Sequence, residues 1–211
     1  MDVLVVGSGN VEASVLLQQT ASLAKLVICA DGGARHCKQA DITPHVIVGD
    51  FDSIDVNLLQ AYEKEGVELK KYEPRKDFTD MELALEYAAE HGATRIFMMG
   101  AMGSRLDHSL SNLQLLHKLM DKGIRGVILN ENNRVYLIRD KIKISRMDGY
   151  KLSLLPATPI VEGVTTEGLT WPLFNFTMTM GTGLGISNEF AEDAATIRIS
   201  SGRLYVILSR D

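Results

Sequence analysis

Aspartates recur in this chain beside short apolar runs, often with glycine next to them. They occur in four segments: Ala30-Asp31-Gly32-Gly33, Val48-Gly49-Asp50-Phe51-Asp52-Ser53, Lys76-Asp77-Phe78-Thr79-Asp80 and Gly103-Ser104-Arg105-Leu106-Asp107-His108. Three of these segments follow apolar runs that are typical of buried strands, and the third in order opens a helix. Ligands of parallel α/β sheets bind outside the carboxyl ends of the strands. The four segments are therefore expected to converge on one site.

Asp50 and Asp52 have the spacing of a magnesium site. They are two residues apart, so in an extended chain both carboxylates point to the same side of one loop. Mg²⁺ prefers a few carboxylate oxygens and completes its shell with water and substrate phosphate, whereas zinc favours His or Cys. A single Asp in such a loop could instead be a turn or cap residue, which is the stronger interpretation for Asp31 or Asp107 taken alone. The pair predicts divalent metal binding.

Glycines and cations in the same segments suit a phosphate ligand. Gly32, Gly33 and Gly103 allow backbone amides to come close to phosphate oxygens. Lys76 and Arg105 could neutralise charge on a transferred phosphoryl group, although each could also be a solvated surface charge. The chemistry expected here is metal-assisted phosphate transfer.

The elements that position these segments alternate between strand and helix. Strands are expected at 3–6, 26–30, 46–48, 67–71, 95–99 and 127–129, and helices at 11–25, 56–65, 81–91 and 108–122, with a short one ending at 36. This rhythm predicts an α/β domain with a mainly parallel, doubly wound sheet over residues 1–140. Thr79 followed by Glu82 is a capping box, which puts Asp80 in the first turn of a helix. Residues 7–10, Gly-Ser-Gly-Asn, resemble neither a dinucleotide fingerprint nor a Walker motif.

Residues 141–211 have a different texture, with short alternating runs separated by Gly and Pro. Alternation with a period of two, as in residues 150–155 and 195–200, is typical of half-buried antiparallel strands. This part is expected to form a smaller all-β sandwich or barrel domain.

Composition limits the remaining classes of protein. The chain has 211 residues, of which 45% are hydrophobic and 23% charged, with a net charge of −5. This charge argues against an extended nucleic-acid interface, but a divalent cation would let acidic residues bind one nucleotide. No run approaches the roughly 18 apolar residues of a membrane span, and no signal peptide is evident, so cytoplasmic residence is expected. The two cysteines predict reduced thiols rather than a disulfide or zinc site.

Taken together, the chain resembles the thiamine pyrophosphokinase family over nearly its whole length. The matching segments are Asp31-Gly32-Gly33-Ala34, Gly49-Asp50-Phe51-Asp52-Ser53, Lys76-Asp77-Phe78-Thr79-Asp80, Gly103 through Asp107-His108, Asn130-Glu131-Asn132, Gly168-Leu169-Thr170-Trp171 and Ser187-Asn188-Glu189. The resemblance implies transfer of the β,γ-diphosphate of ATP to the hydroxyl of thiamine, giving thiamine diphosphate and AMP.

The resemblance also implies roles for individual residues. It implies that magnesium and catalysis depend on Asp50, Asp52, Asp77 and Asp107. It implies that ATP and its phosphates are bound by Asp31, Gly32, Gly33, Lys76, Asp80, Gly103, Arg105 and Asn132, and thiamine by Trp171, Ser187 and Asn188. Members of the family are homodimers with the active site at the subunit interface, which is the expectation for this chain.

Two alternatives stay open from the sequence. A pterin pyrophosphokinase or a nucleotide pyrophosphohydrolase would use a similar aspartate-rich sheet, although Trp171 and the β domain favour thiamine. A non-catalytic sensor of a nucleotide or of thiamine diphosphate is the other, but such a module could have lost the metal carboxylates, which are all present.

Overall fold

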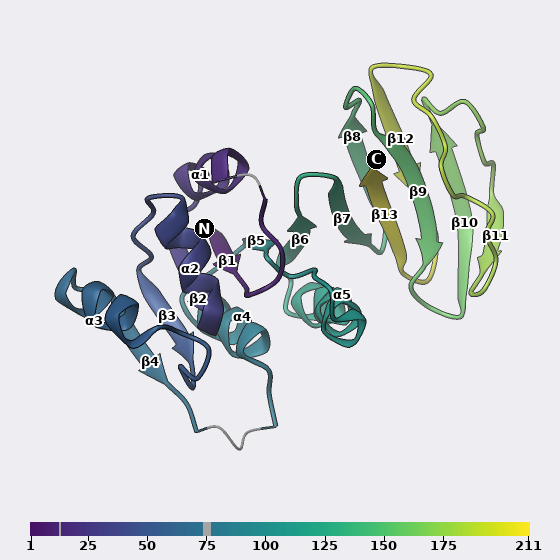
Figure 1. Cartoon of the computed structure of the whole chain (residues 1–211). Helices are drawn as coiled ribbons and strands as arrows, with labels where there is room; N and C mark the ends of the chain where they lie inside the picture. Colours follow the sequence, from purple (N-terminus) through teal and green to yellow (C-terminus); the bar gives the residue numbers. More distant parts are fainter. Residues whose placement is uncertain (13, 74–76) are drawn as a thin grey trace. The chain divides into compact units, whose positions relative to one another are not determined.

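The computed structural model describes residues 1–12, 14–73 and 77–211, and these form two compact units, Met1–Glu131 and Asn132–Asp211 (Figure 1). Strand β7 (Asn133–Ile138) belongs to the second unit because it pairs along its length with β13 (Leu204–Ser209). The structural division therefore lies before this strand, whereas the ranges 1–140 and 141–211 divide the chain after it.

The first unit alternates strands and helices. Its elements are β1 (Asp2–Val6), α1 (Ser14–Leu23), β2 (Leu26–Ala30), the 3₁₀ turn η1 (Asp31–Gly33), α2 (Ala34–Gln39), β3 (Val46–Gly49), α3 (Val56–Lys64), β4 (Glu68–Lys71), α4 (Asp80–Glu90), β5 (Arg95–Met99), α5 (Leu106–Asp121) and β6 (Arg125–Leu129). The strands pair in parallel in the order β4-β3-β2-β1-β5-β6. This order grows outward from β1 in both directions, which confirms the doubly wound sheet.

Strand β1 lies at the centre of this sheet, and its position indicates which edge of the sheet can bind a ligand. Residues 3–6 are fully buried, as the run of apolar residues predicts for a strand covered on both faces. β1 pairs with β2 on one side and with β5 on the other. The strand order reverses between β1 and β5, and such a switch point is where doubly wound sheets bind ligands.

The helix starts at this edge of the sheet differ in their capping. Thr79 caps α4 as predicted, because its Oγ1 accepts a hydrogen bond from the N–H of Glu82 at 3.2 Å, and Asp80 is the first helical residue. Helix α5 begins at Leu106, and its N-cap residue Arg105 makes no side-chain cap. Among the helices of the described residues, none combines the length and apolar character needed to cross a membrane.

The second unit consists of antiparallel strands. They are β7, β8 (Lys141–Ser145), β9 (Lys151–Pro156), β10 (Ile160–Glu167), β11 (Phe176–Thr179), β12 (Ala194–Arg198) and β13. One sheet runs β7-β13-β9 and the other β11-β10-β12-β8. Buried side chains of both sheets, such as Leu154 and Val206 from one and Val161 and Ile197 from the other, form a single apolar core. The prediction of a smaller all-β sandwich or barrel domain is confirmed, with two sheets sharing one core.

Candidate active site

A cavity of about 480 Å³ opens at the carboxyl edge of the parallel sheet, in the first unit. Segments after β1, β2, β3 and β5 and the starts of α4 and α5 contribute to it. Its lining residues are Gly7, Ser8, Gly9, Asn10, Ala30, Asp31, Arg35, Asp50, Asp52, Ser53, Thr79, Asp80, Met81, Gly100, Ala101, Met102, Gly103, Ser104, Arg105, His108 and Asn112. The four aspartate segments recognised in the sequence therefore do meet at one place.

Three carboxylates in this cavity form a group that could hold a metal ion. One oxygen each from Asp31, Asp50 and Asp52 can be chosen so that all three lie within 4.8 Å of one another. Asp31 is only 6% exposed, and its Oδ1 has no hydrogen-bond partner among the described residues. Buried oxygens of this kind are normally satisfied, so the unpaired acceptor in an acidic group fits a divalent cation.

Burial governs the electrostatics of Asp31. Desolvation raises the pKa of its carboxyl above the ordinary value, and the charges of Asp80 and Asp52 act in the same direction. The nearby Ser53 side chain and Gly32 backbone act in the opposite direction without cancelling the rise in pKa. A bound cation would favour the ionised form, so metal binding and deprotonation of this carboxyl reinforce each other.

The backbone conformation around the three aspartates brings their carboxylates together. Asp31 and Phe51 both have positive φ values, 44° and 68°, which are uncommon for residues with a side chain. Asp50 Oδ1 accepts a hydrogen bond from the N–H of Asp52 at 3.2 Å, and Ser53 Oγ donates to Asp52 Oδ1 at 2.8 Å. Left-handed residues cost energy and concentrate at functional sites, and here they turn the chain so that carboxylates from two neighbouring strands meet.

The glycines around the cavity mostly allow loops to pack closely. A Cβ on Gly100 would lie 2.2 Å from the carbonyl oxygen of Gly7, and one on Gly33 would lie 2.0 Å from that of Val6. The amides of Gly7 and Gly9 donate to backbone carbonyls of Met99 and Gly100, both at 2.8 Å. These amides are thus engaged within the protein, and this edge of the site is built from two loops in backbone contact.

Of the three glycines predicted to bind phosphate, Gly32, Gly33 and Gly103, only one lines the cavity. Gly103 does so, and its N–H donates to Ser109 Oγ at 3.2 Å. Gly32 and Gly33 are buried in the turn after β2 and are not among the lining residues. Close packing against β1 explains why residue 33 is a glycine.

Asp77 and Asp107 are not brought into the acidic group. Both are exposed, and neither is among the lining residues of the cavity in the described part of the chain. Asp107 lies in the first turn of α5 and pairs with Arg105, whose Nη2 is 2.6 Å from Asp107 Oδ2. The Arg105 guanidinium lowers the pKa of this carboxyl. Lys76 lies outside the described residues.

The cavity also contains polar residues that the sequence analysis did not select. Arg35 lines it and donates from Nη2 to the Ser8 carbonyl at 2.6 Å. Asn112 is buried and donates from Nδ2 to the Ala101 carbonyl at 2.7 Å. Arg35 directly follows Asp31-Gly32-Gly33-Ala34 in the sequence, so a cation next to an acidic glycine segment was the available signal. No comparable signal identified Asn112, because its position on α5 depends on helix packing.

Residues predicted to bind thiamine lie in the second unit, as does Asn132. The Trp171 side chain is exposed at 59%, which is unusual for a tryptophan with a purely structural role. Asn188 is buried; its Oδ1 accepts from the Trp171 N–H at 3.1 Å and its Nδ2 donates to the Trp171 carbonyl at 2.7 Å. Ser187 is exposed, with a φ of 59°. Asn188 thus holds the backbone that presents the indole.

Comparison with known proteins gives matches along both units. Residues 17–128 match the family model for the thiamin pyrophosphokinase catalytic domain, and residues 139–204 match that for the thiamin pyrophosphokinase vitamin B1 binding domain. The thiamine pyrophosphokinase of Bacillus subtilis (strain 168) is 33% identical over 188 residues, 88% of each chain. Thiamine pyrophosphokinase 2 of Arabidopsis thaliana is 30% identical over 210 residues, covering 87% of this chain and 78% of the relative.

Solved structures agree with the sequence comparisons. The crystal structure of thiamine pyrophosphokinase from Bacillus subtilis superposes with a TM-score of 0.90 at 29% identity, covering 100% of both chains. That of thiamin pyrophosphokinase from Geobacillus thermodenitrificans gives 0.86 at 29% identity, covering 100% of this chain and 98% of the other.

Proposed function

This chain belongs to the thiamine pyrophosphokinase family, and from that premise we propose that it transfers the β,γ-diphosphate of ATP to the hydroxyl of thiamine. The thiamine oxygen forms a bond to the β-phosphorus, the bond from that phosphorus to the αβ-bridging oxygen breaks, and the hydroxyl proton is released. The products are thiamine diphosphate and AMP. The observation that carries the proposal is the cavity at the switch point of the sheet, whose lining aspartates all lie within the segment that matches the catalytic-domain model.

Magnesium is the metal that fits this cavity. Asp50 and Asp52 would hold it together with Asp31, whose unpaired Oδ1 supplies a third oxygen. When bound, Mg²⁺ offsets the negative charge of the polyphosphate. Participation of Asp77 and Asp107 as further ligands and catalytic groups stays a prediction from the sequence.

The surrounding residues suit a polyphosphate. Arg35 and Arg105 supply positive charge at the cavity, and Gly103 supplies close backbone approach. Asp80, at the start of α4, lies on the same lining and adds to the negative potential that attracts a cation. Phosphoryl transfer depends mainly on positioning and on charge stabilisation. The residues of this cavity would therefore act by orienting ATP for in-line attack by the thiamine hydroxyl.

Thiamine would bind through the second unit. An exposed indole is a suitable platform for a cationic thiazolium ring, and Trp171 offers one. The amide of Asn188 is engaged with the Trp171 backbone, so we assign Asn188 to positioning the indole and Ser187 to the polar edge of the ligand.

We further propose a homodimer whose active site lies at the subunit interface. The second unit exposes apolar side chains between residues 171 and 186: Trp171, Phe174, Phe176, Met180, Leu184 and Ile186. Phe174 is 89% exposed, and a patch of this kind is typical of a contact surface. Light scattering on the purified chain tests this; a monomer at micromolar concentration would contradict it. Cytoplasmic location stays a prediction.

The deciding experiment incubates the purified protein with ATP, Mg²⁺ and thiamine and separates the products by chromatography. AMP and thiamine diphosphate in equal amounts are expected. ADP with thiamine monophosphate would contradict pyrophosphoryl transfer. Absence of any thiamine-dependent product, with binding of nucleotide intact, would favour a pterin pyrophosphokinase or a sensor; pterin substrates and direct binding assays separate these two.

A further inference from the structure

Helices α4 and α5 both contribute to the wall of the cavity from their N-terminal ends. Thr79, Asp80 and Met81 come from the start of α4, and His108 and Asn112 from α5. The two helices contact each other directly. The position of the start of α4 relative to α5 therefore decides how this wall faces a bound nucleotide.

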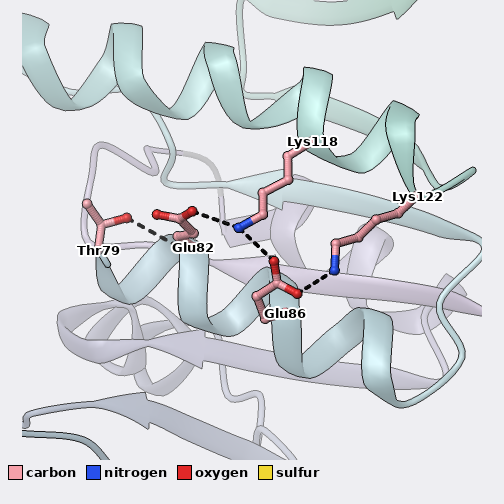
Figure 2. Close-up of polar contacts among 5 residues, drawn as sticks. All are labelled: Thr79, Glu82, Glu86, Lys118 and Lys122. Carbon is pink, nitrogen blue, oxygen red and sulfur yellow. Dashed lines mark hydrogen bonds and ion pairs between the residues drawn. The ribbon is translucent and has the colours of Figure 1, made fainter. Parts of the chain in front are cut away.

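One side chain joins the two helices next to that wall. Lys118 on α5 places its Nζ 2.9 Å from Glu82 Oε1 and 2.8 Å from Glu86 Oε1, both on α4 (Figure 2). The same ammonium lies 5.5 Å from the centroid of the Phe78 ring, just before the α4 cap. Lys118 thus pairs with two successive turns of α4, at Glu82 and Glu86, and lies near Phe78 just before the helix.

Glu82 occupies a structural position in the cap of α4. Its N–H donates to Thr79 Oγ1, while its Oε1 is bound to Lys118 rather than left in solvent (Figure 2). The Glu82 side chain is only 20% exposed. The cap that orients Thr79 and Asp80 is therefore tied to α5 through a partly buried ion pair.

Lys122 provides a comparison within the same network. Its Nζ lies 2.6 Å from Glu86 Oε2, so it joins the same helices, but among the contacts drawn it reaches only Glu86, one turn farther from the cavity (Figure 2). Lys118 and Lys122 have similar side-chain exposure, 40% and 41%. Replacing either lysine removes one ammonium from the network, but only replacement of Lys118 removes the ion pair to Glu82 at the capped end of α4.

We propose that Lys118 is a positioning residue for the reaction: by binding Glu82 it holds the first turn of α4, and with it Thr79 and Asp80, in place at the nucleotide cavity. It also neutralises two carboxylates close to a site that must accept a polyanion. This inference rests on the proposed function, because its kinetic readout requires turnover of ATP.

The test compares Lys118→Met with Lys122→Met in the full chain. We expect similar, small decreases in melting temperature for both, but a decrease of about tenfold or more in kcat/KM for ATP for Lys118→Met only, since small misplacements at a reacting centre cost up to about 100-fold. Hydrogen exchange of residues 77–84 should be faster in Lys118→Met and unchanged in Lys122→Met. Lys118→Arg should recover most of the activity.

Equal kinetic effects in both variants, or unchanged exchange at residues 77–84 in Lys118→Met, would overturn the assignment. If Lys118→Met does not fold, Glu82→Gln decides, because it breaks the same pair from the α4 side and should lower kcat/KM and speed exchange in the same way. Hydrogen exchange needs no turnover, so it tests the clamp even if the wild-type protein proves to have another activity.

Discussion

Replacing Asp52 with asparagine should change stability in opposite directions with and without magnesium. Asp52 sits in a group of three carboxylates whose oxygens lie within 4.8 Å of one another. Without a cation this proximity is repulsive, so the neutral side chain should stabilise the fold. With Mg²⁺ the same carboxylate is a ligand, so its loss should weaken stabilisation by the metal.

The distance between the carboxylates sets the size of the expected change in stability. At 4.8 Å, two unit charges repel by about 1 kcal/mol in a water-like dielectric and about 3.5 kcal/mol at an effective dielectric of 20. Asp52 is exposed, so the lower value applies, and two other carboxylates lie beside it. We therefore expect Asp52→Asn to gain about 1–2 kcal/mol without metal, which corresponds to about 3–6 °C in melting temperature for a chain of this size.

Differential scanning fluorimetry with EDTA and with Mg²⁺ measures both parts. Wild-type protein should melt higher in Mg²⁺, by an amount equivalent to about 2.7 kcal/mol at 100 times the dissociation constant. Asp52→Asn should lose most of this rise, and its turnover should fall by about 100-fold or more, since metal stabilisation of the transition state is worth several kcal/mol.

Asp148→Asn is the matched control. It removes the same charge from a side chain that is 97% exposed in the second unit. It should melt like the wild type in EDTA and keep the full response to Mg²⁺. An Asp52→Asn protein with unchanged melting in EDTA and an intact magnesium response would refute the metal-site assignment.

Three further predictions concern packing, pH and the second substrate. Gly33→Ala would place a Cβ 2.0 Å from a backbone oxygen of β1 and should destabilise by about 3 kcal/mol in urea unfolding; Gly183→Ala, with open space around it, should stay within about 0.5 kcal/mol. Burial alone would raise the pKa of Glu86, but two lysines at the end of α5 outweigh burial and lower it. Its contribution to stability is therefore complete above the ordinary pKa of 4.5 and is lost as pH falls through the lower folded value, so the Glu86→Gln variant should show a flatter loss of unfolding free energy from pH 6 to pH 3. Trp171→Leu should raise the KM for thiamine about tenfold and leave the KM for ATP unchanged, because a cation–π contact is worth about 0.5–2 kcal/mol; equal changes in both constants would contradict an indole platform.

Local chemistry made much of this architecture predictable. β-branched apolar runs with helical segments between them identified the parallel sheet, and the period of two identified antiparallel strands such as β9 and β12, although not β7 or β8. Thr79 and Glu82 are three residues apart, so their cap needs only helix geometry and could be recognised in the sequence. Asp50 and Asp52 were equally accessible, because one short loop holds both carboxylates.

Other features depended on contacts between segments that are distant in the chain. Asp31 joins the acidic group because β2 and β3 are neighbours and its own backbone takes a left-handed turn, which no residue spacing reveals. Asp107 is grouped with the other aspartates by sequence pattern, yet in the fold it pairs with Arg105 and does not itself line the cavity.

Features set by local sequence can thus be distinguished from features set by contacts between distant segments. The sequence by itself determined the strands and helices of the first unit, several strands of the second, one cap and the aspartate pair, since these depend on side-chain character and on spacings of a few residues. Only the tertiary structure decided that the Gly7 and Gly100 loops pack backbone to backbone, and that Lys118 reaches Glu82 across 36 residues. Packing between elements sets these contacts, because a side chain's neighbours depend on how whole strands and helices are arranged.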